Sequence, residues 1–156
     1  MSFVSFLGSL FSSAVDVADN SARVIGELTP FFRRINAGEE VYAREFEYAY
    51  DVRGYNLQSK QADIKLLKAW DRPGTYVIIN HTKHKLLVGY GNRIYQKVDR
   101  HLRGHGEVDI YIDYTGGCCM VVKFKKLEDT EFTDVESLFK DYLAEIKRTY
   151  KDYKKY

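Results

Sequence analysis

The chain has little cysteine, little proline and no strong excess of either charge, and each shortage excludes a class of protein. Its 156 residues include two Cys, two Pro and one Trp, and the formal net charge is +2 at pH 7. Two cysteines cannot form the framework of a disulfide-stabilised secreted domain, which fits a reducing compartment. A net charge so close to zero does not produce the overall basic field of many nucleic-acid-binding proteins.

The two cysteines, Cys118 and Cys119, are neighbours in the sequence. We predict a strand over residues 118–124, in which adjacent side chains point to opposite faces, so a disulfide between them would be strained. Two small strand residues are therefore the prediction, and a vicinal redox switch is the less favoured alternative.

A long hydrophobic run is also missing. The uncharged N-terminal stretch ends at Asp16, short of the roughly 20 residues that span a bilayer, and no Lys or Arg precedes it as in a secretory signal. We therefore expect no integral membrane segment and a cytoplasmic location. Residues 3–28 place apolar side chains on one helical stripe and serines on another, which predicts an amphipathic helix.

Three roles for the amphipathic helix of residues 3–28 stay open. It can pack on its own domain, it can pair with another copy of the chain or with a partner protein, or it can lie on a membrane surface. The absence of basic residues from its polar face weighs against the membrane surface.

The glycine loops that hold nucleotide phosphates are absent as well. The nearest candidate, Gly-Tyr-Gly-Asn at 89–92, lacks the later glycine and the lysine that Walker and Rossmann motifs need. The sequence therefore excludes a P-loop nucleotide hydrolase and a dinucleotide-binding fold.

Aromatic residues, by contrast, are abundant. Thirteen Tyr and nine Phe accompany an apolar fraction of 45%, which indicates a folded protein with a half-polar surface that contacts a ligand or a partner. Before residue 71 we predict helices over 30–36 and 58–70, with a turn at 53–56. Residues 39–52 are ambiguous: we favour a helix, but their aromatic and apolar side chains from 46 to 52 also alternate as in a strand. The breaker Asp-Arg-Pro-Gly at 71–74 then divides a mainly helical region (1–70) from an α+β domain (71–156).

The stretch from 74 to 102 organises the second domain. A β-branched and aromatic run at 75–80 and an apolar run at 86–89 predict two strands joined by a polar loop at 81–85. A helix follows a turn at 91–92, with Asn92 as its predicted N-cap. Between residues 83 and 103 there are six Lys or Arg and one acidic residue. We therefore take the following as candidate nucleic-acid-binding residues, with a solvated surface as the alternative: Lys83, Lys85, Arg93, Arg100 and Arg103.

The remaining residues predict two strands and a helix. Alternating apolar side chains at 108–114 and an apolar run at 118–124 predict a hairpin around 115–117, followed by a charged loop at 125–132. Thr133-Asp134 is predicted to cap a last helix that reaches residue 148, with Glu136, three residues after Thr133, completing a capping box. The tail, 151–156, is predicted to be frayed. The expected fold is α+β, a small mixed or antiparallel sheet flanked by helices, with an N-terminal helical extension.

The motifs of the second domain resemble those of the GIY-YIG nuclease family. Gly-Thr-Tyr at 74–76 corresponds to the family's Gly-Ile-Tyr strand, and Leu-Val-Gly at 87–89 to its Tyr-Ile-Gly strand. Counted from the glycine of the second motif, the family has an apolar residue five positions on, an Arg eight on and a His or Tyr twelve on. This chain has Ile94, Lys97 and His101 at those positions, and the resemblance covers about residues 74–150.

The resemblance implies a Mg²⁺-dependent DNA endonuclease that hydrolyses phosphodiester bonds. In the family, a strand tyrosine acts on the attacking water, an Arg on the first helix holds the phosphate, and a Glu on the last helix binds the metal ion. In this chain Tyr76 corresponds to the strand tyrosine and Lys97 to the phosphate-holding Arg. His101 corresponds to the His of the first helix, and Asp141 to the metal-binding Glu. Tyr90 could replace the hydroxyl that the family's second motif carries and this chain lacks.

Departures from the family pattern imply an alternative function. Leu87 replaces a tyrosine, Lys97 loses the bidentate geometry of Arg, and Asp141 is one methylene shorter than Glu. The alternative is a degenerate GIY-YIG scaffold that binds DNA or a protein, or an assembly component. By analogy with the family, such a protein would be encoded by a phage or a mobile element. A phage-encoded protein could be associated with the virion and not with the cytoplasm. A zinc site of His101 and His105 with a hairpin histidine is a less favoured alternative.

Overall fold

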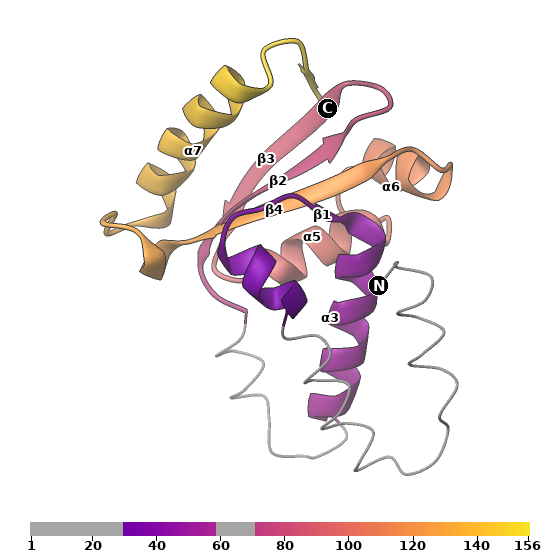
Figure 1. Cartoon of the computed structure of the whole chain (residues 1–156), viewed down its shortest axis with the longest axis horizontal. Coiled ribbons are helices and arrows are strands. Elements are labelled where there is room, and N and C mark those ends of the chain that lie inside the picture. Colours follow the sequence, from indigo (N-terminus) through magenta and orange to yellow (C-terminus); the bar gives the residue numbers. More distant parts are fainter. Residues whose placement is uncertain (1–29, 59–70) are drawn as a thin grey trace.

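The computed structural model describes residues 30–58 and 71–156, which form a five-stranded mixed sheet with helices on both faces (Figure 1). The strands lie in the order β1-β4-β2-β3-β5, and only the pairing of β3 with β5 is parallel. The predicted α+β class is therefore confirmed. The helix predicted over 3–28, and residues 59–70 of the helix predicted over 58–70, lie outside the described residues. None of the helices within the described ranges has the length and apolar character that crossing a membrane requires.

The central strand is β2 (Gly74–Asn80), and all seven of its residues are buried. It pairs antiparallel with β3 (Lys85–Gly91) on one side and with β4 (Met120–Lys126) on the other. The β-branched and aromatic composition that predicted a buried strand is explained by this central position. The polar loop at 81–84 closes the β2–β3 hairpin as predicted.

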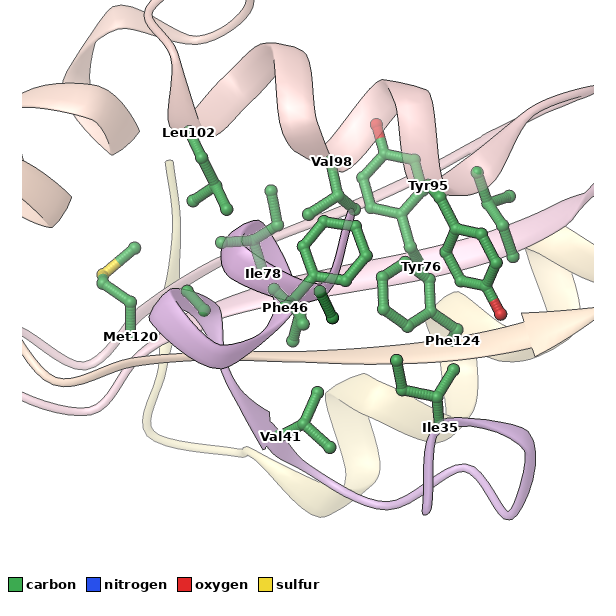
Figure 2. Close-up of a cluster of buried hydrophobic side chains, with 14 of the residues drawn as sticks. Ile35, Val41, Phe46, Tyr76, Ile78, Tyr95, Val98, Leu102, Met120 and Phe124 are labelled. Atoms are coloured by element: carbon green, nitrogen blue, oxygen red, sulfur yellow. The ribbon is translucent and has the colours of Figure 1, made fainter. Parts of the chain in front are cut away.

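Alternate residues of β2 enter two separate cores. Tyr76 and Ile78 point into the larger core, which contains Phe46, Tyr95 and Phe124 (Figure 2). The intervening residues of β2 point to the other face, where the buried stripe of α7 (Val135–Thr149) covers them. The side-chain period of two therefore assigns each strand residue to one of two helical layers.

The described residues before residue 71 belong to the same core as those after it. Residues 30–36 are helical, as predicted. β1 (Val41–Tyr42) pairs with β4, and α3 (Ala43–Gln58) buries Phe46 completely. The turn predicted at 53–56 is wrong, because α3 includes these residues and ends only at Gln58. A glycine in a helix interior costs only about 1 kcal/mol, which the packing of the rest of α3 offsets.

Helix α5 (Ile94–Leu102) is confirmed, but its cap is not the predicted one. Asn92 does not cap the helix, and Arg93 occupies the N-cap position without a side-chain hydrogen bond. The cap comes instead from Asp71, more than twenty residues earlier. Its buried carboxylate accepts hydrogen bonds from the backbone N–H groups of the second and third helix residues, at 2.9 and 3.0 Å. Such a cap is invisible to rules that use neighbouring residues only.

The strand predicted at 108–114 is wrong, because this segment forms helix α6 (Val108–Thr115). Its buried residues are Ile110, Asp113 and Tyr114, spaced three and four apart as on one helical face. Val108 and Ile112, which the alternation placed in a core, are each 55% exposed. The two free cysteines consequently lie in the connection between α6 and β4, outside any strand.

The charged segment after residue 124 also differs from the prediction. β4 includes residues 125–126, and a single 3₁₀ turn, η1 (Leu127–Asp129), follows. Helix α7 is confirmed with its buried stripe of Leu138, Tyr142 and Ile146. Its N-cap is Asp134, the second residue of the predicted Thr133-Asp134 cap, and the Asp134 carboxylate accepts the backbone N–H of Ser137 at 2.8 Å. The predicted capping box with Glu136 is not formed.

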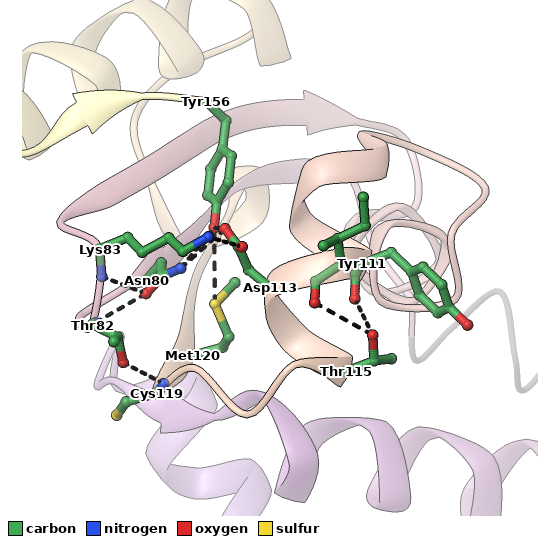
Figure 3. Close-up of polar contacts among 10 residues, drawn as sticks. Asn80, Thr82, Lys83, Tyr111, Asp113, Thr115, Cys119, Met120 and Tyr156 are labelled. Atoms are coloured by element: carbon green, nitrogen blue, oxygen red, sulfur yellow. Dashed lines mark hydrogen bonds and ion pairs between the residues drawn. The ribbon is translucent and has the colours of Figure 1, made fainter.

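The C-terminal tail is ordered rather than frayed. β5 (Lys154–Lys155) pairs with the first two residues of β3. The Tyr156 hydroxyl donates to the Asp113 carboxylate at 2.8 Å and accepts from the fully buried Asn80 amide at 3.0 Å (Figure 3). Lys83 Nζ completes this polar cluster 2.6 Å from the same carboxylate. A buried amide and a buried carboxylate therefore hold the tail in place.

Candidate functional site

A cavity of about 1020 Å³ lies at the edge of the sheet, where β3 is no longer covered by β5. Helix α5 borders it on one face of the sheet and the first turns of α7 border it on the other. All four residues predicted as catalytic line it. The described lining residues are Tyr76, Val88, Tyr90, Gly91, Asn92, Arg93, Gln96, Lys97, Arg100, His101, His105, Gly106, Val135 and Phe139.

Tyr76 reaches the cavity because the strand beside it carries a glycine. Gly89 is paired with Tyr76 in the β2–β3 ladder. A Cβ atom on Gly89 would lie 2.3 Å from the Tyr76 hydroxyl oxygen, well inside van der Waals contact. The ring is 3% exposed, and burial raises the pKa of the Tyr76 phenol to about 12. At neutral pH the hydroxyl therefore keeps its proton.

His101 contacts Tyr76 in a fixed orientation. Its Nδ1 atom accepts the backbone N–H of Glu107 at 2.8 Å, which places the proton of the neutral ring on Nε2. Nε2 lies 3.2 Å from the Tyr76 hydroxyl oxygen and donates to it. Burial lowers the pKa of His101, and the charges of Lys97 and Arg100 add to this effect. The imidazole is therefore neutral near pH 7, and the tyrosine proton is directed away from it.

Three cations line the cavity, and no carboxylate does among the described lining residues. Arg93 has a distant partner, since its Nε atom lies 4.0 Å from the Asp71 carboxylate. Lys97 and Arg100 form no ion pair with any described residue, and both are exposed. The stem of Lys97 lies along Gly91, where a Cβ atom would be 2.9 Å from the lysine Cε. The electrostatic character of the cavity is therefore that of an anion site.

The other predicted nucleic-acid-binding residues lie elsewhere and are engaged within the chain. Lys83 pairs with Asp113 in the polar cluster. Lys85 lies over the ring of Tyr156, 5.7 Å from its centroid. Arg103 binds the Asp99 carboxylate with its Nε atom at 2.9 Å. Of the five residues proposed from the basic segment, the structure brings only Arg93 and Arg100 to the cavity.

The predicted metal ligand, Asp141, is exposed on α7 and does not line the cavity. The cavity side of α7 is formed by Val135 and Phe139. At about 100° per residue, Asp141 points about 160° away from Phe139, to nearly the opposite side of the helix. Mg²⁺ keeps several water ligands and is held on proteins by one or two carboxylates, so the described lining residues do not fit this ion. Within the described ranges, no three His, Cys, Asp or Glu side chains gather as a metal site would require. Neither Mg²⁺ nor zinc is supported by a ligand set there.

Sequence reasoning missed the hydrophobic side of the cavity. The Tyr90 and Phe139 rings lie 4.7 Å apart, tilted by 36°. Phe139 comes one helical turn after Val135, and this spacing marked an apolar patch beside the buried stripe of α7. The packing of a helix on its sheet decides which of its side chains face a cavity. The spacing of apolar residues along α7 does not contain that information.

Protein-family models, curated protein sequences and solved structures were each compared with the chain, and none of the three comparisons gives a significant match.

Proposed function

We propose that this protein binds the phosphate backbone of nucleic acid in the cavity beside β3, as a GIY-YIG-like scaffold that does not hydrolyse it. The observation that carries the proposal is the composition of the lining: Arg93, Lys97 and Arg100 face a cavity to which no described carboxylate contributes. Lys97 and Arg100, which form no ion pair with a described residue, gain most from a phosphate, because no such pair has to be broken.

The arrangement of the motifs supports the GIY-YIG-like part of the proposal. The two motif strands are neighbours, and the tyrosine of the first is opposite the glycine of the second. The helix that leaves them carries Lys97 and His101 into the same cavity as Tyr76. A phenol from β2 and an amine and an imidazole from α5 therefore line one cavity, in the order that the family resemblance implies.

Two features argue against hydrolysis. The described lining residues include no carboxylate that could bind a divalent cation. Tyr76, with a pKa of about 12, would be ionised in only about one molecule in 10⁵ at pH 7, whereas an effective general base has a pKa near the working pH. The neutral phenol is instead suited to donate a hydrogen bond to a phosphate oxygen.

Binding is tested by fluorescence anisotropy with a labelled oligonucleotide at several salt concentrations. We expect the logarithm of the affinity to fall linearly with the logarithm of salt concentration. Lys97→Gln and Arg100→Gln should each weaken binding and reduce that slope by about one. Lys147→Gln is the matched control, because it removes the same charge from an exposed position in the last turn of α7, outside the cavity. Equal effects of Lys97→Gln and Lys147→Gln would contradict the proposal.

Metal-dependent hydrolysis is the second candidate, favoured by the contact between Tyr76 and His101. Plasmid nicking with Mg²⁺ or Mn²⁺ separates it from binding alone. We expect no nicking above background by the wild-type protein. Nicking that Tyr76→Phe abolishes would establish hydrolysis and refute the non-hydrolytic proposal. Nicking that Tyr76→Phe leaves unchanged would point to a contaminant.

A further inference from the structure

The cavity combines an aromatic surface with its cations. Tyr90 is 41% exposed, although one side of its ring lies against Phe139 on α7. Binding of a phosphate by the cations of the cavity does not need this aromatic pair. An exposed ring with a supported back face is, however, the form of a base-stacking platform in proteins that bind single strands.

The cations and the aromatic pair lie on opposite sides of the edge strand. Gly91 contacts the Lys97 stem on the α5 side, and Tyr90, its neighbour, contacts Phe139 on the α7 side. Both residues belong to the part of β3 that β5 leaves uncovered. A ligand that touches both surfaces must therefore pass around the edge of the sheet.

We propose that the cavity takes an unpaired nucleotide of a single-stranded nucleic acid, whose base stacks on Tyr90 while Lys97 and Arg100 hold the adjacent phosphates. This inference rests on the proposed function and specifies its ligand. It combines the sequence-tolerant stacking of bases on aromatic rings with backbone neutralisation by the cations.

A duplex does not fit the same surfaces. Its base faces are covered by neighbouring base pairs, and only base edges are exposed in the grooves. A duplex is also stiff over tens of base pairs, so it cannot bend around one strand to bring a phosphate to α5 and a base to α7. A single strand has a free base face and rotatable backbone bonds.

The test uses the full chain with a single-stranded oligonucleotide that contains 2-aminopurine, a fluorescent base that is quenched when it stacks. The same oligonucleotide annealed to its complement is the duplex probe. We expect quenching on binding of the single strand and weaker binding of the duplex. Tyr90→Ala should weaken single-strand binding by about 5- to 150-fold and remove the protein-induced quenching, whereas Tyr90→Phe should retain both, because the ring and not the hydroxyl stacks.

Tyr111→Ala is the matched control, because Tyr111 is 40% exposed on α6 and lies outside the cavity. Salt-sensitive binding that Lys97→Gln weakens, with equal effects of Tyr90→Ala and Tyr111→Ala, would overturn the stacking inference and leave the proposed function standing. Loss of binding in Tyr90→Phe would assign the role to the hydroxyl and also overturn it. No binding of either probe by the wild-type protein would refute the proposed function itself.

Discussion

Replacing Gly89 by alanine tests whether the glycine of the second motif exists to admit Tyr76. The added Cβ atom would lie 2.3 Å from the tyrosine hydroxyl oxygen and 2.4 Å from its Cζ atom. Carbon atoms pack comfortably at about 3.5 Å, so the ring would have to move by roughly 1 Å. Such a shift would break the 3.2 Å contact between Tyr76 and His101.

The expected cost follows from burial. Tyr76 is 3% exposed in the larger core, and overpacking a well-packed core costs about 1–3 kcal/mol. The lost hydrogen bond adds about 1 kcal/mol. We therefore expect Gly89→Ala to lower the free energy of unfolding by about 2–4 kcal/mol, measured by urea denaturation with far-UV circular dichroism at an unchanged m value.

Gly91→Ala is the control in the same strand. The three heavy atoms nearest to its Cβ atom all belong to the Lys97 side chain, with Cε at 2.9 Å. A flexible side chain moves aside for less than about 0.5 kcal/mol. In a Tyr76→Leu background, where the ring is absent, Gly89→Ala should cost at least about 1 kcal/mol less than in the wild type. Equal costs in the two backgrounds, or a Gly89→Ala variant as stable as Gly91→Ala, would refute the reasoning.

Three further predictions concern titration and capping. His101 should titrate by NMR with a midpoint below 6.5, because burial favours its neutral form. The contribution of His101 to the free energy of unfolding is complete above its unfolded-state pKa and is lost as the pH falls through its lower folded-state pKa. A midpoint above 6.5 would contradict the described environment. Burial of Asp113 tends to raise its pKa, but hydrogen bonds from Lys83 and Tyr156 outweigh this and lower it. Asp113→Asn should therefore destabilise the protein by about 1–3 kcal/mol at pH 7, and the difference should shrink as the pH falls below about 4, where the wild type also loses the charge; a constant difference would argue against the ion pair. Asp71→Ala should cost about 1–2 kcal/mol through the lost cap, whereas Asp141→Ala, at an exposed position, should stay within about 0.5 kcal/mol of the wild type in thermal unfolding; similar losses in both would contradict the capping role.

The elements that the sequence predicted well have a strong local signal. The β2–β3 hairpin, α5 and α7 combine clear periodicity with turn residues at their ends, and the structure has all of them. Segment 108–115 failed because its apolar residues alternate by chance over a few positions. Tertiary packing decides between the two periods there: Ile110 and Asp113, three residues apart, are both buried, and residues at this spacing share a face only in a helix.

The candidate site was predictable where it depended on motif spacing. Tyr76, Tyr90, Lys97 and His101 do line one cavity, because two paired strands and the helix that follows them fix their relative positions. Asp141 was carried over by counting along α7, and a helix changes direction by about 100° per residue, so a small error in register turns a side chain away from the cavity. Contacts between distant segments, such as the Asp71 cap, leave no mark in the local sequence.

The opening amides of α5 have a consequence for how an anion is held. The first three are already taken, one by the Arg72 carbonyl and two by the Asp71 carboxylate. In many proteins the free backbone N–H groups at a helix N-terminus bind a phosphate. Here two of them are hydrogen-bonded to the Asp71 carboxylate instead. An anion that enters the cavity would therefore be bound by the long side chains of Lys97 and Arg100 and not by these amides. The affinity of this cavity for an anion would then depend on ionic strength more than on the shape of the anion.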